Sequence, residues 1–236
     1  MYKKIETICI KENVKLTKLG LSEHSFGNVS VRVNANLFFI KPSGVNVIKL
    51  KKGHCPLIDI NTGKIVNRST LKPSVDMPTH LEIYRNFKNI KSISHCHSMY
   101  ATAWAQASRS IPLLGTTHAD FWKNDIPVVK YLKKAEMKKY ELHTGRLICK
   151  KIKDEKIDVD TCPGLLVSGH GQFSWGNNYV KAVINSNLIE YIAHMAYASI
   201  KIGIKKKLPK YISKFHFNRK HSKKKYYGQN SNIIIK

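Results

Sequence analysis

The segment from Ile93 to His97 constrains the fold more than any other feature of this chain, because it is a short apolar stretch that carries two histidines. Its length and composition predict a β-strand. Residues i and i+2 of a strand share one face of the sheet, so His95 and His97 would direct their imidazoles to the same place. A divalent metal prefers such ligands, although two hydrogen-bonded strand histidines would show the same pattern.

The apolar residues elsewhere predict a mixture of helices and hairpins around this strand. Several segments follow helical spacing, and Pro78 suits the first turn of the helix that it opens. This order of elements predicts an α/β fold whose sheet is not purely parallel. The expected helices are 2–18, 78–87, 100–107 and 179–202, and the expected strands are 28–33 with 36–40, 57–60 with 64–66, 93–97 and 165–168.

The size and cysteine content favour a single domain in a reducing compartment. A chain of 236 residues and 26.9 kDa can bury a sizeable core. Its start lacks the unbroken apolar core of a signal peptide, and no apolar run approaches the ~20 residues that cross a bilayer. The five cysteines are scattered and form no C-x-x-C pair, so a disulfide framework and a thiolate zinc site are not indicated. A cytoplasmic protein that binds no membrane is expected.

The net charge of +26, from 41 Lys+Arg and 15 Asp+Glu, raises nucleic-acid binding as a possible function. The lysines are spread over most of the chain, however, and only residues 205–207 and 223–225 form true lysine runs. Such runs are usually solvated surface. No RNA-binding signature accompanies the charge, so we expect no nucleic-acid partner. The surplus charge would instead attract phosphorylated substrates.

Further candidate ligands and acids lie in turn-like segments along the chain. His170 stands between two glycines just past a short apolar strand, where its side chain is a candidate ligand or an ordinary loop histidine. Asp76 lies upstream of the histidine pair. Asp120 ends the polar segment 115–120 and is either a general acid/base or a cap for its neighbours.

Two short segments are suited to binding an anion. Residues 26–30 and 41–44 combine small residues, which let backbone N–H groups approach phosphate, with hydroxyl donors and the ammonium group of Lys41. Each is also compatible with an ordinary turn. Near the end, residues 215–217 and 226–229 carry more aromatic and ionisable groups than a frayed terminus needs.

Taken in order, these segments resemble the L-ribulose-5-phosphate 4-epimerase family of the class II aldolase and adducin-like superfamily. The likeness covers nearly the whole chain, and its specificity comes from nine short motifs in register. The motifs are Gly27–Ser30, Lys41–Gly44, Lys72–Ser74, Asp76–His80, His95–Ser98, Ala101–Ala107, Gly115–Asp120, His170–Gly171 with Trp175–Gly176, and Tyr226–Gln229.

The resemblance implies a single-domain class II aldolase-like α/β/α fold over residues 1–236, with a central, largely antiparallel mixed sheet flanked by helices. It implies an isomerase that interconverts L-ribulose 5-phosphate and D-xylulose 5-phosphate by retro-aldol and aldol chemistry. It also implies one zinc ion, or another divalent metal, per subunit. The implied metal ligands are Asp76, His95, His97 and His170, and the implied phosphate-binding residues are Gly27, Asn28, Lys41, Ser43, Gly44 and Ser74.

The same resemblance implies Asp120 and Tyr227 as the acid/base pair, with His216 assisting. It implies a homotetramer with active sites between subunits, in which residues 205–236 contribute to a neighbour's site. One departure concerns the phosphate: this chain has Val75 where the family commonly has a second serine after Ser74.

Three alternatives remain open from the sequence. A class II aldolase of the fuculose or rhamnulose phosphate type would release its fragments, but such relatives typically carry a glutamate where this chain has Asp76. A non-catalytic, adducin-like binding protein would not need the intact histidines. An RNA-binding protein would need affinity for nucleic acid that survives physiological salt.

Overall fold

The structure is a computed structural model that describes residues 2–23, 26–69 and 71–222. Its centre is a seven-stranded sheet in the order β3-β2-β1-β4-β7-β6-β5. All neighbouring strands are antiparallel except β5 and β6, which are parallel. The strands are β1 (Gly27–Arg32), β2 (Leu37–Ile40), β3 (Leu57–Asp59), β4 (Ser92–Cys96), β5 (Val128–Val129), β6 (Gly164–Val167) and β7 (Gly171–Gly176).

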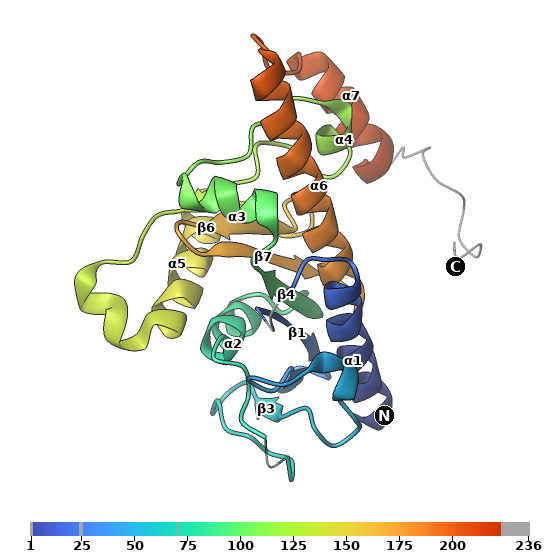
Figure 1. Cartoon of the computed structure of the whole chain (residues 1–236), viewed down its shortest axis with the longest axis vertical. Coiled ribbons are helices and arrows are strands. Elements are labelled where there is room, and N and C mark those ends of the chain that lie inside the picture. The colour runs from blue at the N-terminus through green and yellow to red at the C-terminus, as the bar shows by residue number, and fades with distance from the viewer. Residues whose placement is uncertain (1, 24–25, 70, 223–236) are drawn as a thin grey trace.

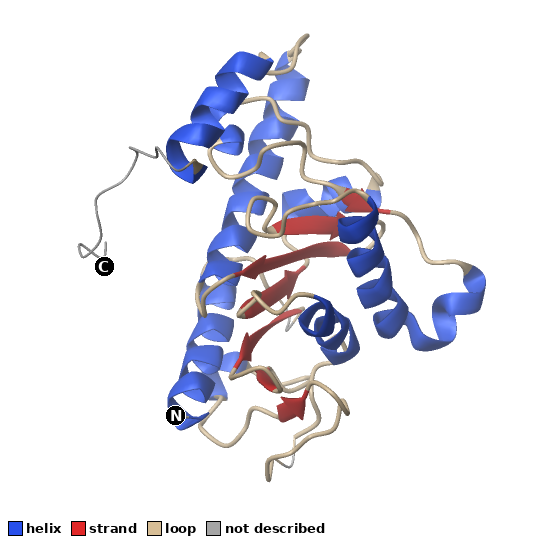
Figure 2. Ribbon diagram, turned by 180° about the vertical axis from the view of Figure 1, so that it is seen from behind, coloured by secondary structure: helices blue, strands red, loops and turns tan. Residues whose placement is uncertain are grey.

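Helices cover both faces of this sheet and make a single α/β domain (Figures 1 and 2). One face packs against α1, α3 and α6, and the other against α2 and α5. The elements are α1 (Tyr2–Lys18), η1 (Val47–Lys49), α2 (Met77–Asn86), α3 (Met99–Gln106), α4 (Thr116–Ala119), η2 (Lys134–Lys139), α5 (Tyr140–Asp154), α6 (Lys181–Ile202) and α7 (Lys210–His221).

The central strands show why the two faces differ. Successive side chains of a strand alternate between faces. On β4, Ile93 and His95 lie on the α2/α5 face, opposite Trp175 and Phe173 of β7. Ser94 points the other way and bonds to Ser186 of α6. The β4 strand therefore presents its first histidine on the face that α2 and α5 cover.

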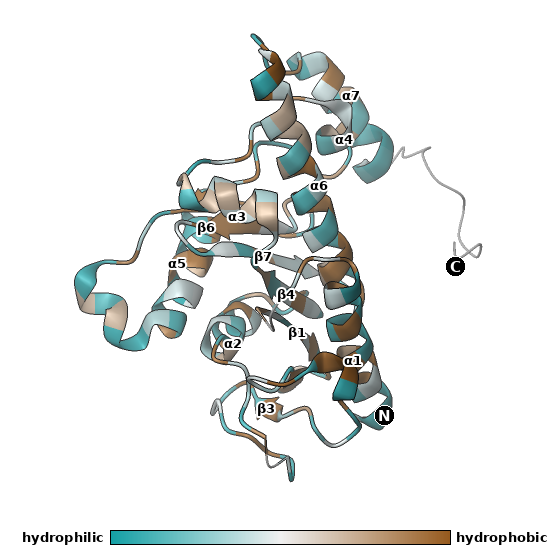
Figure 3. Cartoon of the chain, viewed as in Figure 1, coloured by the Kyte–Doolittle hydropathy of each residue, from teal (hydrophilic) through white to brown (hydrophobic). Residues whose placement is uncertain are grey.

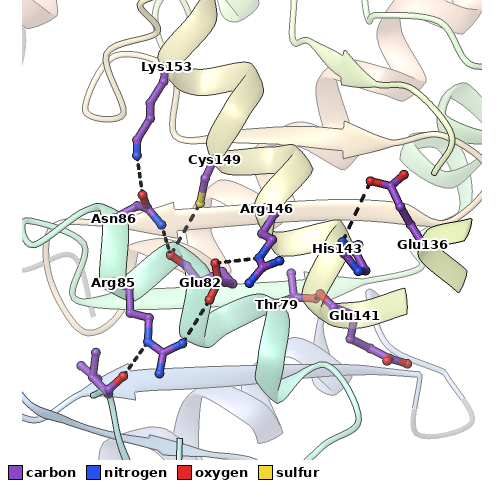
Figure 4. Close-up of polar contacts among 11 residues, drawn as sticks. Thr79, Glu82, Arg85, Asn86, Glu136, Glu141, His143, Arg146, Cys149 and Lys153 are labelled. Carbon is purple, nitrogen blue, oxygen red and sulfur yellow. Dashed lines mark hydrogen bonds and ion pairs between the residues drawn. The ribbon is translucent and has the colours of Figure 1, made fainter. Parts of the chain in front are cut away.

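Contacts between α2 and α5 bring the first turns of both helices together (Figure 4). The Glu82 carboxylate of α2 lies 3.1 Å from Arg85 and 3.7 Å from Arg146 of α5. The hydroxyl of Thr79 donates a 2.6 Å hydrogen bond to the carbonyl oxygen of Glu141. The start of α5 is thus held beside the start of α2, which matters for the site described below.

A second, smaller group of helices lies beyond the sheet, where α7 packs on α4 next to the C-terminal part of α6 (Figure 1). Figure 3 shows apolar residues along the strands and much of α6, whereas α7 and the segment leading into α5 are mainly hydrophilic. Among the helices that the structure describes, none combines the length and the apolar character needed to cross a membrane.

The fold confirms the predicted α/β class with its mixed, largely antiparallel sheet. The helices expected at 2–18, 78–87, 100–107 and 179–202 and the hairpin at 28–40 are present within a few residues. The second hairpin was wrong in part, because residues 64–66 form only an isolated bridge from Ile65 to Ile58 of β3. Seven elements were missed: η1, α4, β5, η2, α5, β7 and α7.

Candidate metal centre and adjoining pocket

His95 is the most tightly held side chain of the candidate site. It is 1% exposed, and its ring stacks on Phe173 with the ring centroids 4.1 Å apart. Its Nδ1 lies 2.8 Å from the backbone carbonyl oxygen of Gln172. Because a carbonyl only accepts, Nδ1 carries the proton and Nε2 keeps a free lone pair. This is the usual arrangement of a histidine prepared for a metal.

His97 and His170 meet His95 because β4 and β7 are antiparallel neighbours. Cys96 at the end of β4 pairs with Gln172 near the start of β7, so the residue after β4 lies beside the turn 168–170 that precedes β7. The three ring centroids are 4.6 to 4.9 Å apart. One nitrogen from each ring lies within 4.8 Å of the others. Three histidines thus converge from two strand ends.

Asp76 adds a carboxylate at the residue before α2. Its Oδ2 lies 4.0 Å from Nε2 of His95 and accepts a 2.7 Å hydrogen bond from the side-chain amide of Asn28. Asn28 is in β1 directly opposite His95. Burial alone would raise the pKa of Asp76, but the nearby His95, His80 and His170 and the bond from Asn28 together hold that pKa below its ordinary value. The carboxylate is therefore ionised at neutral pH.

These groups fit a divalent metal ion. Burial lowers the pKa of all three histidines, with that of His170 at about 4, so the imidazoles are neutral and able to act as ligands. The Nε2 atoms of His95 and His97 are 3.1 Å apart. Tetrahedral bonds of 2.0–2.1 Å would place two ligand nitrogens about 3.3 Å apart, close to this value. Three neutral nitrogens and one carboxylate are also a common donor set for zinc.

A pocket of about 220 Å³ opens next to the histidines. It is lined by residues of both segments that the sequence predicts to bind an anion, and by Ser74 and Val75. Gly27 has a φ of +128°, and a Cβ there would lie 2.9 Å from the carbonyl oxygen of His95, so only glycine fits. All six predicted phosphate-binding residues line this pocket: Gly27, Asn28, Lys41, Ser43, Gly44 and Ser74.

Lys41 is the cation of this pocket. The residue is 4% exposed, and burial lowers the pKa of its ammonium group, against the opposing effect of Asp76. Val75, whose side chain has no hydrogen-bond donor, is 65% exposed at the pocket rim. The pocket therefore combines small loop residues with one buried positive charge.

Tyr140 and Glu141 also line the pocket, and the sequence prediction missed both. The Tyr140 hydroxyl lies 3.2 Å from Nδ1 of His170, and burial raises the pKa of this tyrosine. The two residues open α5, which was not predicted. Helical spacing of Ile148, Cys149 and Ile152 was the available signal for this helix.

Asp120 and His216 form a separate cluster, where α7 packs on α4. Asp120 is 8% exposed, and its carboxylate lies 3.2 Å from Nδ1 of His216. Arg219 donates bonds of 3.1 and 2.9 Å to its two oxygens, and Nζ of Lys220 lies 3.6 Å away. Burial would raise the pKa of Asp120, but these groups, with Arg219 foremost, hold it below its ordinary value.

Within one described chain, the Asp120 cluster does not line the histidine pocket. The views in Figures 1 and 2 both place α4 and α7 beyond the end of the sheet, away from α2. Asp120 and His216 contact each other, but neither lines the pocket that contains His95, His97 and His170. Tyr227, the other predicted acid/base residue, lies outside the described residues.

Comparison with known proteins agrees with the fold. Residues 9–197 match the family model described as the Class II Aldolase and Adducin N-terminal domain. The chain therefore belongs to the class II aldolase and adducin family.

A relative from Mycoplasma pneumoniae is 39% identical over 223 residues, which cover 93% of this chain and 92% of the relative. That protein is named "Probable L-ribulose-5-phosphate 4-epimerase UlaF". This similarity supports the epimerase branch that the sequence motifs resemble.

Solved structures of the family share the fold at low sequence identity. An L-fuculose 1-phosphate aldolase superposes with a TM-score of 0.73 at 22% identity, covering 90% of this chain and 94% of the other. An aldolase II superfamily protein from Pseudomonas syringae has a TM-score of 0.72 at 13% identity, covering 94% and 84%. These similarities establish the class II aldolase fold.

Proposed function

We propose that this protein is a metal-dependent 4-epimerase that interconverts L-ribulose 5-phosphate and D-xylulose 5-phosphate. The observation that carries the proposal is the convergence of His95, His97 and His170 with Asp76 beside a pocket lined by Lys41 and small loop residues. The named relative supports the choice of sugar phosphate. Zinc is the proposed metal because the donors are three imidazoles and one carboxylate.

The stereocentre at C4 carries no acidic proton, so simple deprotonation cannot invert it. The proposed route breaks the C3–C4 bond, which leaves an enediolate of dihydroxyacetone and glycolaldehyde phosphate, and re-forms the bond on the other face of the aldehyde. The bound divalent ion supplies positive charge that stabilises the negative charge developing at the C2 and C3 oxygens. His95, His97, His170 and Asp76 would hold that ion.

The proposed phosphate site keeps the aldehyde fragment in the pocket while it rotates. Lys41 supplies a positive charge, and Ser43 and Ser74 supply hydroxyl donors at the pocket wall. Asn28 has a different task in this geometry, because its amide nitrogen donates to Asp76. We assign Asn28 to orienting the Asp76 carboxylate, with Gly27 and Gly44 leaving room for phosphate next to the backbone.

Inversion needs proton transfer on both faces of C4, and Asp120 and Tyr227 are the proposed pair. One of them takes the C4 hydroxyl proton during cleavage, and the other returns a proton after the aldehyde has turned. Arg219 and Lys220 keep Asp120 ionised, so it has no proton to give and would enter the reaction as the acceptor. His216, 3.2 Å from Asp120, assists by orienting the carboxylate.

We propose that the active site forms between subunits of a homotetramer. In the described chain Asp120 lies away from the histidine pocket, so the two half-sites would have to come from neighbouring copies. Tyr191 and Ile202 of α6 are 56% and 87% exposed, as expected for a helix that contacts another subunit. Residues 205–236 would then carry His216 and Tyr227 to a neighbour's pocket.

The testing experiment is conversion of L-ribulose 5-phosphate to D-xylulose 5-phosphate by purified protein, before and after chelation and zinc restoration. Turnover that disappears with the chelator and returns with zinc supports both the reaction and the metal. A folded, zinc-loaded protein that does not convert the substrate contradicts the proposal. Release of dihydroxyacetone phosphate from fuculose or rhamnulose phosphate would assign the chain to the aldolases instead.

A further inference from the structure

Glu190 of α6 makes a set of hydrogen bonds next to the proposed metal ligands, on the opposite side of the sheet. Its Oε1 accepts a 2.8 Å bond from the backbone N–H of Tyr100, and its Oε2 accepts a 2.9 Å bond from that of Ala101. Oε2 also accepts a 2.7 Å bond from the hydroxyl of Ser98. One carboxylate thus binds three donors at the start of α3.

These bonds replace the usual cap of a helix. Ser98 is the N-cap residue of α3, and an N-cap serine usually accepts a bond from the second or third backbone N–H of its helix. Here the Ser98 side chain makes no such bond. The second and third N–H groups, those of Tyr100 and Ala101, are bound by Glu190 instead. The cap of α3 therefore comes from α6, across the packed interface between the two helices.

The freed Ser98 hydroxyl connects Glu190 to the histidines. It accepts a 2.7 Å bond from the side-chain amide of Gln172 while donating to Glu190. The backbone carbonyl of the same Gln172 holds Nδ1 of His95. A continuous chain of bonds therefore runs from Glu190 through Ser98 and Gln172 to the ring of His95.

His97 is held between two fixed points of this network. It is the single residue between Cys96, the end of β4, and Ser98, the N-cap of α3. Strand pairing with β7 fixes the first point, and the Glu190 bonds fix the second. His97 is an exposed residue, whereas His95 is buried. The contacts that the His97 ring makes therefore hold it less firmly than the contacts of the His95 ring hold His95.

We infer that Glu190 is a positioning residue for the metal centre, because it fixes the β4–α3 junction that carries His97 and the Gln172 carbonyl that orients His95. It touches neither substrate nor metal. The inference rests on the metal site in the proposed function. Loss of partners that orient metal ligands typically weakens metal binding about 10- to 100-fold, and an effect of this size is expected here.

The test measures two properties of the wild-type protein and its variants. The first is the Zn²⁺ affinity of the metal-free protein, by competition with a chromophoric chelator, and the second is the visible spectrum of the Co²⁺ form. Glu190→Ala removes all three acceptor bonds, and Glu190→Gln keeps two at most. Ser98→Ala removes the hydroxyl bond to Glu190 and the link to Gln172, but it leaves the two backbone bonds to Glu190 in place. Glu6→Gln is the matched control, because the buried Glu6 carboxylate of α1 also accepts bonds from backbone N–H groups. Its donors are Gly53 at 2.7 Å and Cys55 at 3.2 Å, which lie in a loop next to α1.

We expect the Zn²⁺ dissociation constant to rise about 10- to 100-fold in Glu190→Ala. The Zn²⁺ dissociation constant is expected to rise less in Glu190→Gln and Ser98→Ala, and the Co²⁺ bands should be altered in both. Glu6→Gln should change neither the dissociation constant nor the bands. The thermal midpoint of each metal-free variant separates this effect from a general loss of stability. Where Glu190→Ala does not fold, Glu190→Gln and Ser98→Ala carry the test.

Two results would overturn the inference, and they are distinguishable. Wild-type affinity and Co²⁺ bands in Glu190→Gln, together with a lowered midpoint of the metal-free protein, would show that Glu190 only caps α3. Wild-type protein that binds neither Zn²⁺ nor Co²⁺ would remove the metal site of the proposed function, and this inference with it.

Discussion

The histidine pocket and the Asp120 cluster are built on opposite electrostatic principles. In the pocket, three histidines have lowered pKa values and stay neutral beside the ionised Asp76, so the site is prepared for a cation. In the Asp120 cluster, arginine and lysine side chains surround one carboxylate and keep it ionised. The first suits metal binding, and the second suits a base that must remain charged in a partly buried place.

The two regions also differ in how they are held. The three histidines and Asp76 lie at the ends of central strands and at the start of α2, next to the main hydrophobic core. The Asp120 cluster depends on α4, a four-residue helix, and on α7, which has no buried residues in the described chain. In the proposed inter-subunit site, the sheet of one chain would supply the histidine pocket, and a neighbouring chain would supply the Asp120 cluster.

Replacing one histidine of the pocket is expected to have the largest effect. His97→Asn removes a metal donor, so the Zn²⁺ dissociation constant should rise by more than the roughly 100-fold that loss of a supporting contact can cause, and turnover should vanish. Chelator competition and the coupled epimerase assay measure the two effects. His143→Asn of α5 is the control, since His143 faces Glu136 outside the pocket (Figure 4). Full metal affinity in His97→Asn would remove His97 from the site.

Replacing the carboxylate of the other region separates chemistry from metal binding. Asp120→Asn is expected to lower kcat about 10²- to 10⁴-fold, as for loss of a general acid/base, while Zn²⁺ affinity stays at the wild-type value. Steady-state kinetics and metal titration on the same preparation test this. Asp125→Asn, whose partner is Lys207 at 2.7 Å, is the control in the same loop. A fall in Zn²⁺ affinity without a fall in kcat would mean that Asp120 acts in metal binding and not in proton transfer.

Mixing the two inactive variants tests whether the regions cooperate across subunits. When His97→Asn and Asp120→Asn chains are unfolded together and reassembled in equal amounts, about a quarter of the sites at a heterologous interface combine two intact halves. We expect activity to recover to about that fraction of the wild-type value. Mixed oligomers of verified composition that stay inactive would contradict a site shared between subunits.

The Asp120 cluster should also make stability depend on pH. The folded-state pKa of Asp120 lies below its ordinary value of 3.8, so its ionised form stabilises the fold above that pH. This contribution is present at neutral pH and should be lost as pH falls through the folded-state pKa. Urea unfolding of wild type and Asp120→Asn should therefore give curves that differ at neutral pH and converge in acid. A constant difference at all pH values would mean that the ion pairs contribute nothing.

The smallest expected effect concerns the phosphate side of the pocket. Val75→Ser adds a hydroxyl at the exposed rim, where a hydrogen bond contributes about 0.5–1.5 kcal/mol. We expect KM to fall by up to about tenfold with kcat unchanged, because the new bond is the same in substrate and transition state. Val66→Ser, at an exposed position outside the pocket lining, is the control. An unchanged KM would place the phosphate away from residue 75.

Local patterns were sufficient for much of the fold. The strand that carries His95, the helix opened by Pro78 and the long helix α6 were all predicted, because periodic apolar residues and a proline at the first turn act over a few residues. The missed β7 contains alternating Phe173 and Trp175, but Gln172 and Ser174, which alternate with them, are buried and bonded to their neighbours rather than exposed. Buried polar residues of this kind hide a strand from pattern analysis.

Only part of the candidate site could be predicted from such local patterns. Strand spacing and turn-like segments singled out the histidines and Asp76, and motif resemblance grouped them as one ligand set. Tyr140 and Glu190 were not predicted, because long-range hydrogen bonds connect them to the site. Glu190 lies 89 to 92 residues from its three partners. An acid within an apolar helix was the only trace of this role in the sequence.

The sequence by itself indicated which residues are candidates for the chemistry and which short elements hold them, because helix and strand preferences and motif spacing are local properties. The tertiary structure decided which of those residues meet. Antiparallel pairing of β4 with β7 brings His95, His97 and His170 together, and packing of α7 on α4 keeps Asp120 apart from them in the described chain. These contacts depend on strand order and helix packing, which bring together residues that are far apart along the chain. No single segment of the sequence contains the information that predicts them.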